Sequence, residues 1–272
     1  MTTAGLVIFT DLDGTLLDHD SYDWSPAIPS LSQLREHRIP LILNSSKTAP
    51  EIEHLRTELG NDHPYIVENG AAVIVPPNCF EPAEREVKTL GASRARVLAV
   101  LNACRAQGLR FRGFADMTVD EVVSCTGLAP ESAAQAMDRL ATEPLLWEDS
   151  ETALAAFQQR LAEHNLQLRR GGRFFHAMGC FDKADGLRWL MHRYRQHSTT
   201  ELRSVALGDS PNDWQMLAAA DIAVVIRSAC PTSDLPDGDQ SFIYSNHRGP
   251  TGWNECVLRI LDQHGYAYRP TR

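Results

Sequence analysis

The chain has 272 residues, 43% of them hydrophobic and 22% charged, which is typical of a globular protein with one large domain or two modest ones. Its formal net charge of −9 argues against a nucleic-acid partner, but a small anionic substrate stays possible because a metal ion or a few cations can invert the local charge. No apolar run approaches the ~20 residues that span a bilayer, so we expect a cytoplasmic protein without membrane association.

Both ends of the chain alternate short apolar segments with helical patterns. The apolar segments lack polar alternation, which indicates strands of a mostly parallel sheet covered on both faces, a Rossmann-like doubly wound α/β core. One helical pattern has a capping box at Thr48 and Glu51 and a glycine stop at Gly60. We expect strands over 6–9, 40–43, 65–67, 71–75, 204–207, 222–226 and 242–244, and helices over 26–38, 48–60, 184–195, 212–219 and 254–264.

The middle of the chain follows a different pattern. Long helical patterns cover 92–107, 130–141 and 150–164. The segments RFRGFADM and LQLRRGGRFFHAM look like strands of an antiparallel sheet. We therefore expect a second α+β domain inserted into the first. In this division, residues 1–80 and 181–272 form the first domain, and residues 81–180 form the inserted one.

Two carboxylates follow the first expected strand. Asp11 and Asp13 point the same way, because alternate residues of an extended strand share a face. In open α/β sheets, ligands bind at the carboxyl ends of the strands. A divalent cation is the simplest compensation for two neighbouring carboxylates. An isolated Asp-Leu-Asp-Gly also fits a plain turn, but an EF-hand loop is excluded because glycine is fourth and Tyr22 is twelfth.

Three further segments carry polar side chains at the end of a strand or before a helix. LILNSSKT ends in the hydroxyls of Ser45 and Ser46 and in a lysine. DKADG supplies Lys183 before a helix, and VALGDSPND ends in Asp209 and Asp213. Each segment alone also fits a helix cap or a solvated lysine. All four in this order form a specific pattern.

With these segments the sequence resembles the haloacid dehalogenase superfamily of aspartate-nucleophile phosphatases over nearly its whole length. Within it, SSKT, IVENGAAVIVP, GFADM, TGL, GGRFFH and GPTGW look like the mannosyl-3-phosphoglycerate phosphatase family. The resemblance implies that Asp11 is the nucleophile and that Asp13 is the general acid and then the base. The four segments would serve phosphoryl transfer. Ser45, with Ser46 as its alternative, and Lys183 would bind the phosphoryl group during this transfer.

The resemblance also implies a Mg²⁺ cofactor. Asp11, the backbone carbonyl of Asp13, and Asp209 would be its ligands. Asp213 would act through water or as an outer ligand, and it would also orient Lys183. Loss of either Asp11 or Asp13 would be expected in a non-enzymatic binding module, so the presence of both favours an enzyme.

The implied activity is hydrolysis of mannosyl-3-phosphoglycerate or glucosyl-3-phosphoglycerate to the glycosylglycerate and phosphate. A sugar phosphomutase or a general sugar-phosphate phosphatase is the alternative, and a monomer or weak homo-oligomer is expected. The core motifs recognise only the phosphoryl group, so selectivity must come from elsewhere. The resemblance therefore implies a catalytic core of residues 1–80 and 181–272 and an inserted α+β cap domain, residues 81–180, that determines substrate specificity. Glycine-rich turns and arginines suit a substrate carboxylate. The candidate substrate-binding residues are Lys47, Asn69, Asp116, Arg170, Gly171, Gly172, Arg173 and His176.

Overall fold

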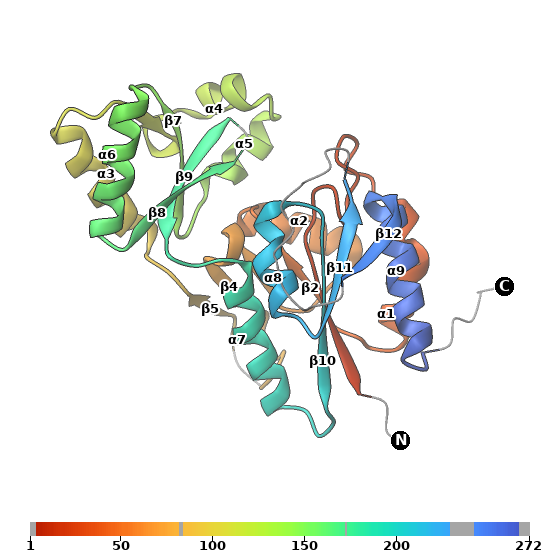
Figure 1. The fold of residues 1–272 in the computed structure, drawn as a ribbon. Coiled ribbons are helices and arrows are strands. Elements are labelled where there is room, and N and C mark those ends of the chain that lie inside the picture. Colours follow the sequence, from red (N-terminus) through yellow and green to blue (C-terminus); the bar gives the residue numbers. More distant parts are fainter. Residues whose placement is uncertain (1–3, 82–83, 172, 229–241, 267–272) are drawn as a thin grey trace.

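The computed structural model describes residues 4–81, 84–171, 173–228 and 242–266. Within these residues the strands form an eight-stranded sheet in the order β12-β11-β10-β1-β2-β3-β4-β5 and a four-stranded sheet in the order β6-β7-β9-β8. The smaller sheet and its helices, here called the smaller layer, lie beyond the carboxyl ends of the parallel strands, on the side of β4 and β5 (Figure 1).

The larger sheet is mostly parallel, as the sequence predicts. All pairings from β12 to β3 are parallel, and the β3–β4 and β4–β5 pairings are antiparallel. Its strands are β1 (Gly5–Thr10), β2 (Leu41–Asn44), β3 (Tyr65–Val67), β4 (Ala72–Val75), β5 (Glu86–Thr89), β10 (Leu202–Gly208), β11 (Ile222–Arg227) and β12 (Ile243–Arg248).

Strand β5 is a difference from the expected organisation. Residues 86–89 fall in the segment that the sequence assigns to the inserted domain, yet they pair with β4 at the edge of the larger sheet. Val87, Lys88 and Thr89 are exposed, so no buried apolar run marks this strand in the sequence. The chain leaves the larger sheet only after Thr89.

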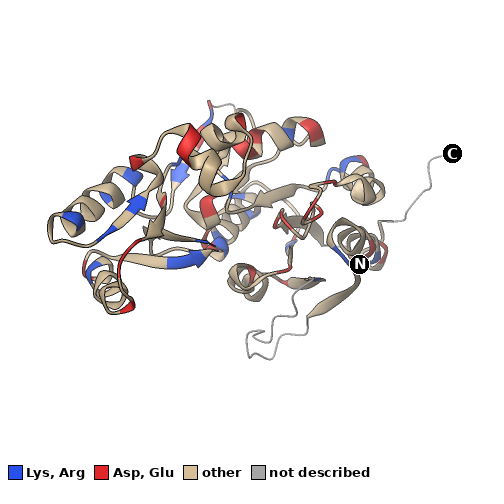
Figure 2. Ribbon diagram, turned by 90° about the horizontal axis from the view of Figure 1, so that it is seen from above, with Lys and Arg blue, Asp and Glu red and all other residues tan. Residues whose placement is uncertain are grey.

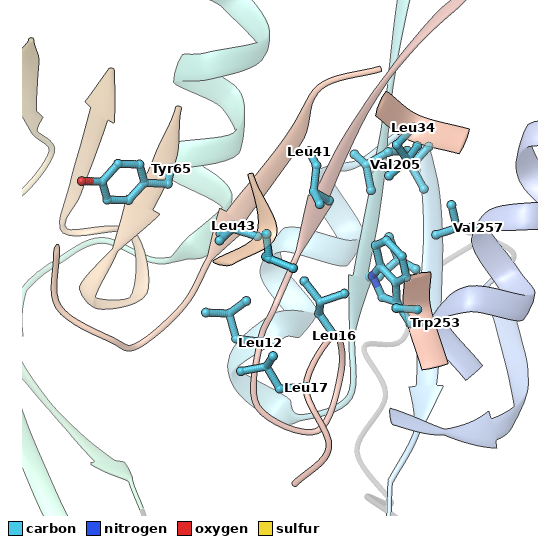
Figure 3. Packing of buried hydrophobic residues seen from close by; sticks show 14 of the residues in the cluster. Leu12, Leu16, Leu17, Leu34, Leu41, Leu43, Tyr65, Val205, Trp253 and Val257 are labelled. Carbon is cyan, nitrogen blue, oxygen red and sulfur yellow. The ribbon is translucent and has the colours of Figure 1, made fainter. Parts of the chain in front are cut away.

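Helices cover both faces of the larger sheet (Figure 1). One face packs against α1 (Ile28–Glu36), α2 (Ala49–Leu59) and α9 (Gly249–Gln263), and the other packs against α7 (Lys183–Gln196) and α8 (Trp214–Ala219). Figure 3 shows part of the first cluster, in which Leu16 and Trp253 are fully buried. The alternation of side chains along each strand supplies both clusters with apolar residues. Helix α9 begins five residues before the predicted start at 254.

The smaller layer contains an antiparallel sheet, which confirms the antiparallel strands predicted for the middle of the chain. Helices α3 (Arg94–Ala106) and α6 (Glu151–Glu163) share one apolar cluster with the sheet. Helices α4 (Val119–Thr126) and α5 (Pro130–Met137) share a second cluster. The strands are β6 (Phe111–Gly113), β7 (Thr142–Trp147), β8 (Leu166–Gly171) and β9 (Phe174–Gly179).

Two elements of the smaller layer are shorter than the sequence predicts. The strand in RFRGFADM ends at Gly113, because the Asp116 carboxylate accepts a hydrogen bond from the Gly113 amide and closes a 3₁₀ turn. The helix predicted over 130–141 ends at Met137. Separately, no helix within the described residues combines the length and apolar character that a membrane crossing requires.

Candidate active site

The polar strand ends of the core meet at one place. Strand β1 lies between β2 and β10, parallel to both, so the residues that follow the three strands are neighbours. Asp11 follows β1, Ser45 follows β2 and Asp209 follows β10. All three are buried. Lys183 reaches the same place from the start of α7, where the chain returns from the smaller layer to the core.

Lys183 is the centre of a buried charge cluster. Its side chain has no solvent exposure, and Nζ lies 2.6 Å from Oδ1 of Asp11 and 2.6 Å from Oδ1 of Asp213. Burial by itself would lower the pKa of Lys183, but the two carboxylates outweigh it and raise that pKa above the ordinary lysine value. Lys183 is therefore held as a cation against the two carboxylates.

Three carboxylates in this cluster repel one another. Burial, reinforced by Asp213 and only partly offset by Lys183, raises the pKa of Asp11 well above its usual range. Burial and Asp213 also raise the pKa of Asp209 to about 6. One oxygen from each of Asp11, Asp209 and Asp213 lies within 4.8 Å of the others. A divalent cation would compensate these charges, and carboxylate oxygens are the ligands that Mg²⁺ prefers.

The hydrogen bonds of the cluster distinguish its carboxylates. Oδ1 of Asp11 accepts a hydrogen bond from Lys183, and Oδ1 of Asp209 accepts one of 3.1 Å from the Thr15 hydroxyl. Both oxygens of Asp213 accept hydrogen bonds, Oδ1 from Lys183 and Oδ2 from the amides of Asp209 and Ser210. The geometry thus favours Asp11 and Asp209 as direct metal ligands, with Asp213 orienting Lys183.

Asp13 stands apart from the carboxylate cluster. Its side chain is 34% exposed, and its Oδ1 lies 3.1 Å from Nζ of Lys47. The Lys47 ammonium also lies over the ring of Tyr22, 5.2 Å from the centroid. Burial alone would lower the pKa of Lys47, but Asp13 and Glu51 raise it overall. Lys47, which the sequence assigns to the substrate, is here the partner of Asp13.

Gly14 permits the chain that follows β1 to approach closely the chain that follows β10. Its φ of +80° is a conformation that L side chains rarely adopt, and a Cβ there would lie 2.6 Å from Oδ2 of Asp209. A side chain at this position would therefore displace the carboxylate that is a candidate metal ligand.

The two serines after β2 differ in their contacts. Ser45 is fully buried, its hydroxyl accepts a hydrogen bond of 3.3 Å from the Lys47 amide, and its carbonyl accepts one of 2.8 Å from the Asn69 amide. The carbonyl of Ser46 instead accepts a hydrogen bond of 3.3 Å from Arg139 of the smaller layer. Ser45 is thus the serine that belongs to the buried end of the site.

A cavity of about 370 Å³ lies between Lys183 and the β8–β9 hairpin. Its wall combines residues that follow the core strands with residues of the smaller layer. The lining residues are Asn69, Arg169, Arg170, Gly171, His176, Met178, Asp182, Lys183, Ser210, Pro211 and Asn212. Seen from above, Asp and Glu positions lie on loops near the centre of the view, beside Lys and Arg positions of the smaller layer (Figure 2).

Four predicted substrate-binding residues line this cavity, namely Asn69, Arg170, Gly171 and His176. Burial and the charge of Arg139 lower the pKa of His176 to about 4, so its imidazole is neutral near pH 7 and offers one donor and one acceptor. The Arg170 guanidinium lies 5.7 Å from the centroid of the Phe175 ring.

Other predicted residues are engaged elsewhere. Asp116 forms an ion pair with Arg105 and accepts a hydrogen bond from the Gly113 amide. Arg173 donates a hydrogen bond of 2.7 Å to the carbonyl of Cys125. Gly172 lies outside the described residues.

Sequence reasoning missed part of the cavity wall. Arg169 also lines the cavity, directly before the predicted residue Arg170. The pair of adjacent arginines in the sequence could have indicated both residues. Asn212, which is not among the expected site residues, also lines the cavity, and its Nδ2 lies 3.3 Å from Oδ1 of Asn69. That contact joins positions 143 residues apart, which no local pattern reveals.

A family model described as haloacid dehalogenase-like hydrolase matches residues 8–127. The glucosyl-3-phosphoglycerate/mannosyl-3-phosphoglycerate phosphatase of Methanococcoides burtonii is 37% identical over 271 residues, covering 94% of this chain and 97% of that protein. The protein of the same name from Persephonella marina is 34% identical over 269 residues, covering 95% of this chain and 98% of that protein.

Solved structures share the architecture at low sequence identity. Thermoplasma acidophilum 0175 has a TM-score of 0.65 and 18% identity, covering 97% of this chain and 100% of that one. The sucrose-phosphatase of Synechocystis sp. PCC6803, solved with sucrose and phosphate, has a TM-score of 0.62 and 14% identity, covering 96% of this chain and 98% of that one. At these identities the likeness concerns the fold alone.

Proposed function

We propose that this chain, which belongs to the haloacid dehalogenase-like hydrolases and to the family of the mannosyl-3-phosphoglycerate phosphatases, hydrolyses a glycosyl-3-phosphoglycerate. The chain is a phosphoric monoester hydrolase of this family, and the proposed reaction uses bound Mg²⁺ and passes through an aspartyl phosphate. The observation that carries this proposal is the buried cluster of Asp11, Lys183 and Asp213 beside a cavity of about 370 Å³. The names of the relatives support the glycosyl-3-phosphoglycerate as the substrate.

In the first proposed step, an oxygen of Asp11 attacks the phosphorus and forms an acyl phosphate. The bond from phosphorus to the glycerate oxygen breaks, and Asp13 supplies a proton to that oxygen. Asp13 is protonated at this step. Its Oδ1 lies beside Nζ of Lys47, and its side chain is exposed enough to meet the leaving group. Lys183 and the Ser45 hydroxyl stabilise the negative charge on the phosphoryl oxygens.

In the second step, Asp13 accepts a proton from water, whose oxygen attacks the phosphorus of the aspartyl phosphate. The bond between phosphorus and Asp11 breaks, which releases phosphate and restores the Asp11 carboxylate. When bound by Asp11, the Asp13 carbonyl and Asp209, Mg²⁺ would neutralise the crowded carboxylates and orient the phosphoryl group.

The proposed activity is tested by a phosphate-release screen of the purified protein with Mg²⁺. The panel contains mannosyl- and glucosyl-3-phosphoglycerate, simple sugar phosphates and an aryl phosphate. We expect inorganic phosphate from all of them and the highest kcat/KM for a glycosyl-3-phosphoglycerate. Transfer of the phosphoryl group to another sugar position without free phosphate would instead identify a mutase.

Metal dependence gives a separate prediction. Excess chelator should abolish activity. Asp209→Asn should raise the Mg²⁺ concentration for half-maximal activity by at least ~10–100-fold, because loss of an outer partner of a metal ligand already costs that much and Asp209 is a direct ligand. Asp221→Asn is the control, because Asp221 accepts hydrogen bonds from Ser204 and lies outside the carboxylate cluster. The measurement is the Mg²⁺ dependence of kcat, and full activity in chelator would refute the metal assignment.

We propose that the smaller layer acts as the cap of the active site and supplies the selectivity for the glycerate carboxylate. Arg170 is the best-placed candidate, because it lines the cavity and its neighbour Gly171 offers close backbone approach. The Phe175 ring beside its guanidinium limits the positions that the charge can take. His176, as a neutral imidazole, can hydrogen-bond to the sugar or the glycerate.

Arg170→Ala should lower kcat/KM for the glycosyl-3-phosphoglycerate by ~10–100-fold, which is the loss of one charged hydrogen bond of ~1.5–3 kcal/mol. Hydrolysis of the aryl phosphate should not change, because its leaving group has no carboxylate. Arg173→Ala is the comparison, since Arg173 holds the Cys125 carbonyl. A selective loss in Arg173→Ala alone would assign the carboxylate contact to Arg173, and equal losses on both substrates would exclude a specificity role.

A further inference from the structure

A buried carboxylate joins the two layers of the molecule next to the site. Glu68 follows β3 of the core and has no solvent exposure. Its Oε2 accepts hydrogen bonds from the amides of Ala141 (3.2 Å) and Thr142 (2.9 Å) and from the Thr142 hydroxyl (2.6 Å), and its Oε1 accepts one from the Leu140 amide. Arg139 adds a charge, with Nε 3.7 Å from Oε2. One core side chain thus binds the whole segment that leads into β7.

The backbone of Glu68 is held in an unusual conformation. Glu68, Asn69 and Gly70 have φ values of +51°, +60° and +99°, all in the region that residues other than glycine rarely adopt. Such strain persists where the surroundings enforce it, and it often marks functional sites. The loop of Glu68, Asn69 and Gly70 is therefore fixed by its contacts and not by its own preference.

Those contacts reach two segments that border the phosphoryl-binding site, the one after β2 and the one before α7. The Glu68 amide donates to the Lys47 carbonyl (2.9 Å), and the Asn69 amide donates to the Ser45 carbonyl (2.8 Å). At Gly70 a Cβ would lie 2.0 Å from the carbonyl oxygen of Asp182, the residue before Lys183. The backbone of this loop thus holds the core side of the site, while the Glu68 side chain holds the smaller layer.

The segment bound by Glu68 is coupled to the cavity wall through the smaller sheet. Thr142 pairs with Met178 in the register of β7 and β9, and Met178 lines the cavity. Strand β9 in turn pairs with β8, which carries Arg170. A shift of the segment at Thr142 would therefore move the cavity-lining residues relative to Lys183.

Two weaker contacts cross between the layers nearby. The Thr48 hydroxyl donates to the Gln135 carbonyl (2.9 Å), and Arg139 donates to the Ser46 carbonyl (3.3 Å). Each is one hydrogen bond, whereas the Glu68 carboxylate accepts four, and hydrogen bonds to a charged group are the stronger kind.

We propose that Glu68 is a positioning residue for substrate selectivity, which sets the distance between the phosphoryl-binding end of the site and the cavity wall of the smaller layer. This inference rests on the proposed function, since it concerns the part of the substrate beyond the phosphoryl group. A substrate that fills the cavity needs both ends at a fixed separation, whereas a small aryl phosphate needs only the core.

The test uses Glu68→Gln and Glu68→Ala in the full chain. Glutamine keeps the volume but replaces one acceptor oxygen with an NH₂ group that faces the backbone donors. Both variants should lower kcat/KM for the best glycosyl-3-phosphoglycerate at least tenfold, mainly through KM, and should leave the aryl phosphate within about threefold of wild type.

Glu143→Gln is the matched control. Glu143 is also fully buried, one residue further along β7 than Thr142, but its carboxylate pairs with Arg94 and accepts from the Ala115 amide inside the smaller layer. This variant should lose thermal stability comparably and keep the wild-type ratio between the two substrates.

Three results would overturn the proposal for Glu68. They are equal losses on both substrates, no loss on either substrate, and the same change of ratio in Glu143→Gln. If wild type prefers another sugar phosphate, the proposed substrate fails, and the same comparison with that sugar phosphate in place of the glycosyl-3-phosphoglycerate still decides the role of Glu68.

Discussion

Asp11→Asn should lower kcat by roughly four to six orders of magnitude while the protein remains folded, the scale found when a catalytic nucleophile is removed. The amide fills the volume of the carboxylate but cannot form an acyl phosphate. Removal of one negative charge also relieves its repulsion with Asp213 and Asp209, while Lys183 keeps Asp213 as a partner. The free energy of unfolding should therefore change little.

The measurement combines steady-state kinetics with acid quenching and mass spectrometry of the peptide that contains Asp11. Wild type should show a phosphorylated peptide during turnover, and Asp11→Asn should not. Asp23→Asn is the control, because Asp23 is exposed and its carboxylate accepts hydrogen bonds from Ser25. Undiminished turnover by pure Asp11→Asn enzyme would end the covalent mechanism.

The residues of the charge cluster could be found from sequence because their signals are local. Asp11 and Asp209 each end an apolar strand, and the rule that ligands bind at the carboxyl ends of parallel strands brings such residues together. The same holds for Thr48 and Glu51, whose capping box starts α2 as predicted. In these cases a few adjacent residues contain the whole signal.

The contacts between the layers could not be found in this way. Glu68 lies between the strands expected over 65–67 and 71–75, and its partners Leu140 and Thr142 are 72 and 74 residues away. Asp116 and Arg173 were chosen for their chemistry, but tertiary contacts place them against Arg105 and Cys125. Residue type shows what a side chain can bind, and only the packing of the layers determines which partner it meets.

Lys183→Met should abolish activity and lower the free energy of unfolding by ~3–5 kcal/mol, the cost of removing one partner from a buried ion pair. Methionine fills a similar part of the buried site but leaves Asp11 and Asp213 without their shared cation. Urea unfolding in chelator measures the loss. Lys88→Met is the control, because Lys88 is exposed on β5 and should change stability by no more than ~0.5 kcal/mol.

The double variant Lys183→Met/Asp213→Asn separates the structural from the catalytic role of this lysine. Removing one carboxylate lessens the uncompensated negative charge, so stability should recover in part and the two substitutions should be non-additive. Activity should not recover, because the phosphoryl oxygens still lack the positive charge of Lys183.

Saturating Mg²⁺ should also stabilise Lys183→Met more than wild type if the metal binds the same carboxylates. Additive stability changes would show that Lys183 and Asp213 are not coupled, and wild-type turnover in Lys183→Met would show that the lysine does not serve the phosphoryl group.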